Sequence, residues 1–337
     1  MADRQKFATI IGRVTRPLSP LYPLPLVFAE EFVVVPGGHA LHVRQSGHPQ
    51  GRTALVLHGG PGSGCSPLLA RFFDPARFRV ICLDQRGAGR SVPAGGTAHN
   101  TTAHLLADLC RLRAHLDIDR WLVVGGSWGA TLALAHALDA PQAVAGLLLR
   151  GVFLARSEDI DAFFAAAASM RPRTWARWRQ RADAGGVSLL DGLAARLKDD
   201  SAVWRRRAAR VWWLAERDLS EATAAALPDA AALDALVPRY RIQAHYLRHR
   251  CWLDAPPLLD RCAALPCVPT LLLHGSRDRV CAPAGAAALH AHLRHAGLRW
   301  VDGAGHDPAH PAMVDAMVRA LDAYADRGTF DAAAGTP

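Results

Sequence analysis

Short, continuously apolar segments alternate along the chain with stretches in which apolar residues recur every three or four positions. The apolar segments are TALVLHGG, FRVICLDQRG, RWLVVGG, AVAGLLLRG, VPTLLLHG and LRWVDG. Helical spacing is clearest in the leucines of 101–116 and returns at 127–140. Buried strands that alternate with amphipathic helices are typical of a parallel sheet with crossover helices. We therefore predict an α/β domain, opened by a hairpin over EFVVVP and ALHVRQ.

This alternation stops between residues 156 and about 255, where no convincing strand occurs. The segment is rich in Ala, Arg and Trp, and we interpret it as a helical cap inserted into the α/β domain. Strands then resume, with helices expected at 283–295 and 311–326. The predicted organisation is an N-terminal arm at 1–29, a core at 30–155 and 256–326, a cap at 156–255 and a tail at 327–337.

The net charge of +9 invites a nucleic-acid partner, but its distribution argues against one. Only Lys6 and Lys198 are lysines, and the remaining basic residues are arginines in an alanine-rich chain. That bias is typical of GC-rich coding. No block of five or six basic residues occurs, and the densest cluster, within 205–210, is expected to be a solvated helix face. We expect no nucleic-acid partner.

The chain contains no apolar run of about 18 residues, so no membrane span is expected. Its N-terminus is basic, and Arg13 and Arg16 break up any apolar core of the kind that a secretory signal has. Seven cysteines without a C-x-x-C pair or zinc spacing suggest reduced, buried thiols and a cytoplasmic protein. Cys65 follows a glycine-rich loop, and we expect it near the functional site.

The segment GGSWG at 125–129 lies directly between a predicted buried strand and a predicted helix. This is where a G-x-S-x-G nucleophile must lie, because the serine is placed on a sharp turn with closely packed neighbours. A serine hydroxyl is a weak nucleophile until a base removes its proton. Ser127 is therefore the predicted nucleophile of an α/β-hydrolase fold, with a mostly parallel, eight-stranded sheet and an inserted helical cap.

His306 is the predicted base, because it follows the last predicted strand and comes after both the serine and a suitable acid. Asp278 is that acid, since it follows the strand VPTLLLHG, where a carboxylate can orient the imidazole. His310 is the alternative base. Asp302 and Asp307 are close to His306 in sequence and are expected to be turn residues.

The segment HGGPG at 58–62 follows the strand TALVLHGG and is expected to form the oxyanion loop. The backbone N–H groups of Gly60 and Trp128 would face the developing oxyanion, and the loss of one such donor typically costs about 3 kcal/mol of transition-state stabilisation. His58 itself is expected to brace the loop rather than to react.

With these motifs in place, the chain resembles the proline iminopeptidase (prolyl aminopeptidase) family of the α/β-hydrolase superfamily. The resemblance spans roughly residues 30–325 and is carried by HGGPGSG, DQRGAGRS, VVGGSWGATLALAHA, LLLRGVF and HGSRDRVCAP. It implies a cytoplasmic serine aminopeptidase without metal or other cofactor, which releases N-terminal proline from peptides. The expected partner is a small-molecule or short-peptide substrate, and a homo-oligomer is left open.

The resemblance also implies two cap residues that bind the free amine of the substrate. AARVWWLAERD resembles the segment that supplies one glutamate, here Glu216, and RIQAHYL resembles the segment that supplies a second. This chain has Gln243 at that second position and Ala215 where a tryptophan is expected before the first. An amide contributes less than a carboxylate to binding of an ammonium, so recognition of a charged N-terminus should weaken.

The sequence is therefore compatible with three functions. The first is a proline iminopeptidase, and the second is a cap-bearing hydrolase of a small ester, lactone or amide, which the Gln243 departure favours. The third is a binding protein that kept the fold without catalysis. A complete set of nucleophile, base, acid and oxyanion loop argues against the third, although a fold alone does not define a substrate.

Overall fold

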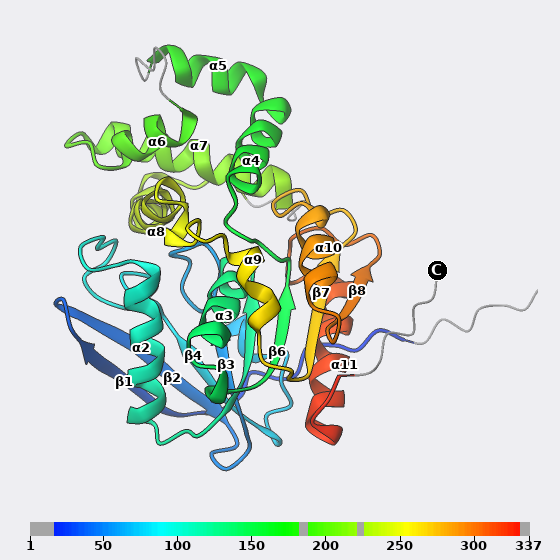
Figure 1. The fold of residues 1–337 in the computed structure, drawn as a ribbon. Coiled ribbons are helices and arrows are strands. Elements are labelled where there is room, and N and C mark those ends of the chain that lie inside the picture. The colour runs from blue at the N-terminus through cyan, green and yellow to red at the C-terminus, as the bar shows by residue number, and fades with distance from the viewer. Residues whose placement is uncertain (1–16, 182–187, 221–225, 331–337) are drawn as a thin grey trace, which may run out of the picture.

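A computed structural model describes residues 17–181, 188–220 and 226–330. Its centre is an eight-stranded sheet in the order β1-β2-β4-β3-β5-β6-β7-β8 (Figure 1). The strands are β1 Val27–Val35, β2 His39–Gly47, β3 Arg52–Leu57, β4 Phe78–Leu83, β5 Trp121–Gly126, β6 Val144–Arg150, β7 Thr270–Gly275 and β8 Gly297–Val301. Strand β2 runs antiparallel to β1 and β4, and the other pairs are parallel. The predicted hairpin and parallel sheet are confirmed.

Helices cover both faces of the sheet and enclose two apolar clusters. The helices of this layer are α1 Pro67–Ala70, α2 Thr102–His115, α3 Trp128–Asp139, α9 Leu258–Arg261, α10 Pro283–His292 and α11 Pro311–Arg327. Side chains of α2, α3 and α10 belong to one cluster, and those of α1 and α11 belong to the other. The central strands are buried on both sides, as in the run Thr270–Gly275, which explains why they are continuously apolar in sequence.

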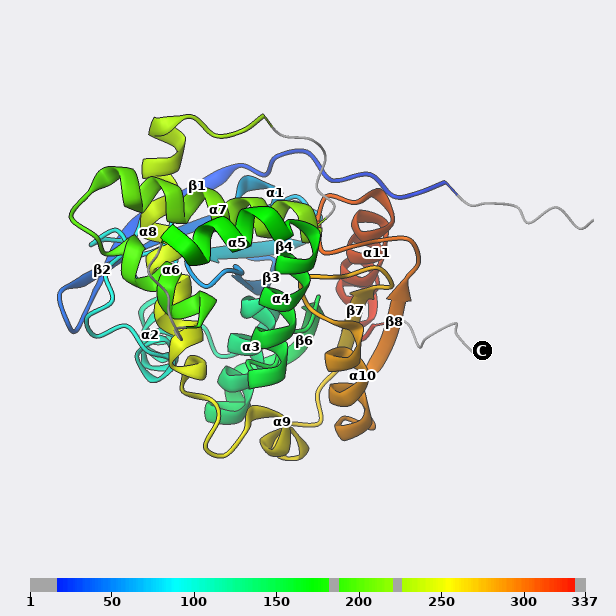
Figure 2. The same cartoon turned by 90° about the horizontal axis from the view of Figure 1, so that it is seen from above.

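The predicted helical insertion is confirmed between β6 and β7. It consists of α4 Ser157–Met170, α5 Pro172–Arg181, α6 Leu189–Leu197, α7 Ala202–Ser220 and α8 Ala230–Arg248. These helices pack on one another, with α7 and α8 in close contact, and lie over the end of the sheet at which the parallel strands terminate (Figures 1 and 2). Stacked rings of Trp212 and Tyr240, with centroids 5.5 Å apart, join α7 to α8.

The described part of the predicted N-terminal arm lies against α11 and not against the cap. The Ser19 N–H donates to Asp315, and the Tyr22 hydroxyl donates to Asp322 at 2.9 Å. Strand β1 begins at Val27, within the segment expected to be an arm. Residues 1–16 and 331–337, also part of the predicted arm and tail, are outside the described residues. Within the described chain, no helix is both long and apolar enough to span a membrane.

Candidate active site

Ser127 lies at the turn between β5 and α3, with the backbone angles φ 57° and ψ −124°. A positive φ is costly for a residue with a side chain, and such strain is frequent at active sites. The turn is possible because its neighbours are glycines. A Cβ at Gly129 would lie 2.0 Å from the carbonyl oxygen of Leu57, and one at Gly125 would lie 2.2 Å from the Gly129 oxygen. These close contacts explain why the motif requires glycine at both positions.

His306 and Asp278 form a hydrogen-bonded pair. The distance from His306 Nδ1 to Asp278 Oδ2 is 2.7 Å, and the other Asp278 oxygen accepts from the backbone N–H groups of Val280 and Cys281. Burial alone would raise the pKa of Asp278, but the positive charge of His306 and these hydrogen bonds lower it. The carboxylate therefore stays charged and can orient the imidazole and stabilise its protonated form.

The neighbouring residues His310, Asp302 and Asp307 do not lie where His306 and Asp278 lie. His310 is the N-cap residue of α11 and does not line the cavity that contains Ser127. Asp307 accepts a hydrogen bond from the backbone of Ala309, as in a turn, and Asp302 accepts one from Ser276 at the protein surface. None of these three side chains is placed to replace His306 or Asp278.

Arg150, at the end of β6, connects Ser127 to the loop of His306, and the sequence alone did not identify it as a site residue. Its backbone oxygen accepts from the Ser127 N–H at 2.9 Å, and its guanidinium Nη1 donates to the His306 backbone oxygen at 2.7 Å. Burial lowers the pKa of Arg150, with Asp278 acting in the opposite direction. The motif LLLRGVF contains this arginine, but its contact across 156 residues has no signal in local sequence.

The HGGPG loop lies above Ser127 and is held by its own histidine. His58 Nε2 accepts from the Gln85 N–H, and its Nδ1 donates to the Gly59 oxygen. The imidazole is therefore neutral, and both of its nitrogens already have hydrogen-bond partners. Gln85 in turn accepts from the indole N–H of Trp128. Among the described residues, no hydrogen bond uses the backbone N–H of Gly60 or of Trp128, which leaves both donors for an oxyanion.

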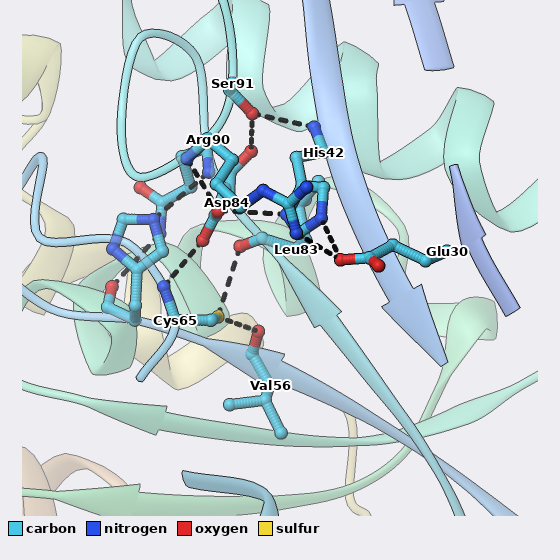
Figure 3. A network of polar contacts seen from close by, with 10 residues as sticks. Glu30, His42, Val56, Cys65, Leu83, Asp84, Arg90 and Ser91 are labelled. Atoms are coloured by element: carbon cyan, nitrogen blue, oxygen red, sulfur yellow. Dashed lines mark hydrogen bonds and ion pairs between the residues drawn. The ribbon is translucent and has the colours of Figure 1, made fainter. Parts of the chain in front are cut away.

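A polar network around Asp84 anchors the far end of this loop (Figure 3). The two carboxylate oxygens accept from the backbone N–H groups of Cys65, at 2.6 Å, and Arg90, at 2.9 Å. His42 lies between Asp84 and Glu30, at 3.1 and 2.7 Å respectively. The network fixes two loops to strand β4, so we interpret it as a support for the oxyanion loop.

Cys65 lies near the site, because Gly64 and Ser66 on either side of it line the cavity that contains Ser127, but its side chain points into this network and not toward Ser127. Its sulfur faces the backbone oxygen of Leu83 at 3.4 Å, and it does not line the cavity that contains Ser127. The cysteine beside the nucleophile is Cys281, whose Sγ lies 3.8 Å from Ser127 Oγ. Burial raises the pKa of the Cys281 thiol well above its ordinary value, so this thiol is an unreactive neighbour.

Ser127 opens onto a cavity of about 430 Å³ between the core and the cap, here called the main cavity. His306 and Gly60 line it from the core, while Glu216 and Gln243 line it from the cap. No hydrogen bond between Ser127 and His306 is present among the described residues, as is frequent in free enzymes before substrate binds. The structure thus brings the predicted nucleophile, base, oxyanion loop and cap residues to one space.

A smaller apolar recess of about 40 Å³ adjoins the main cavity at Ser127. Its apolar lining is Phe153, Ile160, Phe163, Leu247, Val280 and Cys281. Gly60, Ser127, Gln243 and Val280 line both spaces. The recess therefore gives an apolar wall to the space at Ser127, with Gln243 beside it.

Glu216 and Gln243 are hydrogen-bonded to each other, but Glu216 also has a partner that sequence analysis did not find. Gln243 Nε2 donates to Glu216 Oε1 at 2.9 Å, while Arg239 Nη2 donates to Oε2 at 2.7 Å. The Tyr240 hydroxyl donates to the same Oε2 at 3.1 Å. Burial alone would lower the pKa of Arg239, but the negative charge of Glu216 raises it by more, so the guanidinium stays charged.

No group of three or more His, Cys, Asp or Glu side chains among the described residues is placed to hold a metal ion. Ala215, at the position where a tryptophan was expected, is buried within the cap and does not line the main cavity.

Comparisons with known proteins identify the family of this chain. Residues 55–310 match the family model described as alpha/beta hydrolase fold. The proline iminopeptidase of Xanthomonas citri is 37% identical over 318 residues, covering 90% of this chain and 99% of that protein. The proline iminopeptidase of Arabidopsis thaliana is 38% identical over 290 residues, covering 83% of this chain and 75% of that protein.

Solved structures give the same fold. A proline iminopeptidase-related protein of Thermus thermophilus is 28% identical with a TM-score of 0.52, covering 88% of this chain and 96% of that one. A hydrolase of Pseudomonas aeruginosa has a TM-score of 0.61 at 20% identity, covering 87% of this chain and 97% of that one, and supports the fold alone.

Proposed function

This chain belongs to the proline iminopeptidase family of the alpha/beta hydrolase fold, and on that premise we propose that it is a serine aminopeptidase that releases N-terminal proline from short peptides. The observation that carries the proposal is the His306–Asp278 hydrogen bond of 2.7 Å at the cavity that contains Ser127. The apolar lining of the recess beside Ser127 suits contact with the ring methylenes of a prolyl group.

The reaction begins when Ser127 Oγ attacks the carbonyl carbon of the prolyl group. His306 takes the hydroxyl proton, and Asp278 stabilises the resulting imidazolium through the Nδ1 hydrogen bond. The N–H groups of Gly60 and Trp128 donate to the oxyanion. His306 then gives its proton to the leaving amine as the C–N bond breaks, which leaves the prolyl group esterified to Ser127.

Water completes the cycle. His306 removes a proton from the water that attacks the ester, and the tetrahedral intermediate collapses to free proline and the Ser127 hydroxyl. The main cavity, at about 430 Å³, has room for the first residues of a leaving peptide beside this water.

A covalent probe tests the proposal. A fluorophosphonate should label Ser127, and the wild-type protein should hydrolyse prolyl peptides with release of proline. Replacement of Ser127 by Ala should remove both. A protein that hydrolyses prolyl peptides without Ser127, or that is never labelled, would exclude the proposed function.

Hydrolysis of a small ester, lactone or amide is the second candidate. The Arg239–Glu216 ion pair favours it, because Glu216, the one carboxylate that the described part of the cap presents to the main cavity, is already bound to a cation. Relative kcat/KM values for a prolyl anilide and a short-chain aryl ester distinguish the two candidates. Turnover of the ester alone would favour the second.

A further inference from the structure

Gln85 follows strand β4 and connects the HGGPG loop to the helix that begins at Trp128. Its Oε1 accepts from the Trp128 indole N–H at 2.8 Å, and its Nε2 donates to the His58 backbone oxygen at 3.0 Å. Its backbone N–H also donates to His58 Nε2, at 3.1 Å. One residue thus binds both segments that carry the proposed oxyanion donors, the backbone N–H groups of Gly60 and Trp128.

The orientation of the Gln85 amide follows from the chemistry of its partners. An indole N–H can only donate and a backbone oxygen can only accept, so Oε1 must face Trp128 and Nε2 must face His58. All three residues are buried. An apolar side chain in place of Gln85 would therefore leave a buried donor and a buried acceptor without this partner, and the link between the two segments would be lost.

Gln85 does not reach the substrate space itself. It is 3% exposed and lines neither the main cavity nor the recess. Its side chain carries no charge and exchanges no proton at ordinary pH, so it has no direct part in the chemistry at Ser127. Any effect of Gln85 on the reaction must therefore pass through the two residues that it holds, His58 and Trp128.

The HGGPG loop and the nucleophile turn lie in close contact. A Cβ added to Gly59 would lie 3.1 Å from the Gly126 oxygen and 3.3 Å from Ser127 Cβ. His58 extends the hydrogen bonds of Gln85 to this point, because its Nδ1 donates to the Gly59 oxygen at 2.9 Å. An oxyanion donor is effective only at about 2.7–3.1 Å from the position that the oxyanion will occupy. A small shift between the two segments would therefore weaken the site.

We infer that Gln85 is a positioning residue of the oxyanion site, whose amide sets the placement of the Gly60 and Trp128 N–H groups relative to each other. This gives the glutamine of the DQRGAGRS motif a function. The inference rests on the part of the proposed function that concerns attack by Ser127, and not on the identity of the acyl group. An oxyanion needs the two donors more than the carbonyl of a bound substrate does, so loss of Gln85 should lower kcat and leave KM nearly unchanged.

Gln85→Met tests the inference, because methionine has a similar shape and forms neither hydrogen bond. Loss of a whole oxyanion donor lowers kcat by about a hundred- to a thousandfold, and here both donors remain but are less well held, so kcat for 4-nitrophenyl acetate should fall about ten- to thirtyfold. Phenyl trifluoromethyl ketone forms a tetrahedral oxyanion adduct with an active serine. Its affinity should fall by the same factor as kcat, since it resembles the transition state.

Gln45→Met is the matched control. Gln45 is also a buried glutamine, 5% exposed, and its Oε1 accepts from Arg79 at 2.9 and 2.6 Å, but it lines neither the main cavity nor the recess. It should lose stability with unchanged kcat and ketone affinity. Trp128→Phe is a second test, which removes the indole donor and keeps the backbone N–H. It should lower kcat, and its combination with Gln85→Met should lose little more than Gln85→Met alone, because both changes break the same link.

The outcomes separate the inference from the proposed function. Unchanged kcat and ketone affinity in folded Gln85→Met overturn the inference and leave the aminopeptidase intact, as do equal losses in Gln85→Met and Gln45→Met. If Gln85→Met does not fold, unchanged kcat in Trp128→Phe overturns it. Multiplicative losses in the double variant also overturn it. A wild-type protein that hydrolyses 4-nitrophenyl acetate at Ser127 but releases no proline from prolyl peptides overturns the proposed function and leaves the role of Gln85 standing.

Discussion

The guanidinium of Arg150 donates to the backbone oxygen of His306 at 2.7 Å, and so connects the end of β6 to the loop that carries the base. The same residue accepts from the Ser127 N–H through its backbone oxygen. Nucleophile and base are thereby positioned by one residue of the central sheet. Arg150 therefore acts by holding Ser127 and His306 in position, and not by contact with the reacting atoms.

Replacement of Arg150 by Met should lower kcat by ten- to a hundredfold with little change in KM. The physical reason is loss of a charged hydrogen bond, which contributes about 1.5–3 kcal/mol and here holds the His306 loop. Arg150→Lys should recover part of kcat. Steady-state kinetics on 4-nitrophenyl acetate measures both effects, and circular dichroism checks that the variants fold. An increase in KM at constant kcat would mean that Arg150 contacts the substrate instead.

Ser127→Ala should abolish turnover and leave the fold intact, because it removes one hydroxyl and no core packing. His306→Ala should cost about as much, and the double variant should lose little more, since triad members act as a unit. Initial rates on an aryl ester, measured to below one thousandth of wild type, test this. Independent, multiplicative losses would show that the two residues do not act together.

Gly151 lies against the catalytic pair, with φ 55°, and a Cβ there would be 3.1 Å from His306 Cε1 and 3.3 Å from Asp278 Oδ2. Gly151→Ala should therefore reduce kcat more than tenfold. Gly38→Ala is the control, because Gly38 also has a positive φ, of 76°, but no atom within 4 Å of the added Cβ. The control should lose about 1 kcal/mol of stability with unchanged kcat. Equal losses of activity would refute the steric argument.

Stability should fall in mild acid because of His136. This imidazole is buried on α3, where Nε2 accepts from the Trp121 indole N–H, and burial lowers its pKa to about 4. Between pH 6.5 and 4 the unfolded chain binds a proton that the folded protein does not, so the free energy of unfolding decreases as pH falls. The decrease is about 3 kcal/mol. Urea unfolding of wild type and His136→Gln at pH 7, 5.5 and 4.5 should give a shallower slope for the variant.

The strands and the catalytic motifs were predictable because their signals are local. A parallel strand buried on both faces, such as β7, must be continuously apolar. Ser127 is identifiable because the turn requires glycines at fixed offsets, as the 2.0 Å approach at Gly129 explains. His306 and Asp278 follow from their order along the chain and their places after strands.

The partners of these residues could not be predicted in the same way. The pairing of Arg239 with Glu216 depends on how α7 and α8 pack, and the two residues are 23 positions apart. Cys65 and Cys281 both lie in loops near the site, and only side-chain direction places Cys281 beside Ser127. Sequence patterns report burial and spacing but not the direction of a side chain on a loop.

The cap is inserted between two strands, β6 and β7, that are neighbours in the sheet. Its helices therefore leave and rejoin the core at adjacent points, and a change within them need not disturb the strands. Glu216, Arg239 and Gln243 belong to the cap, whereas Ser127, Asp278 and His306 belong to the core. Substitutions in α7 and α8 can therefore change what the cavity accepts while the segments that carry Ser127, Asp278 and His306 stay as they are.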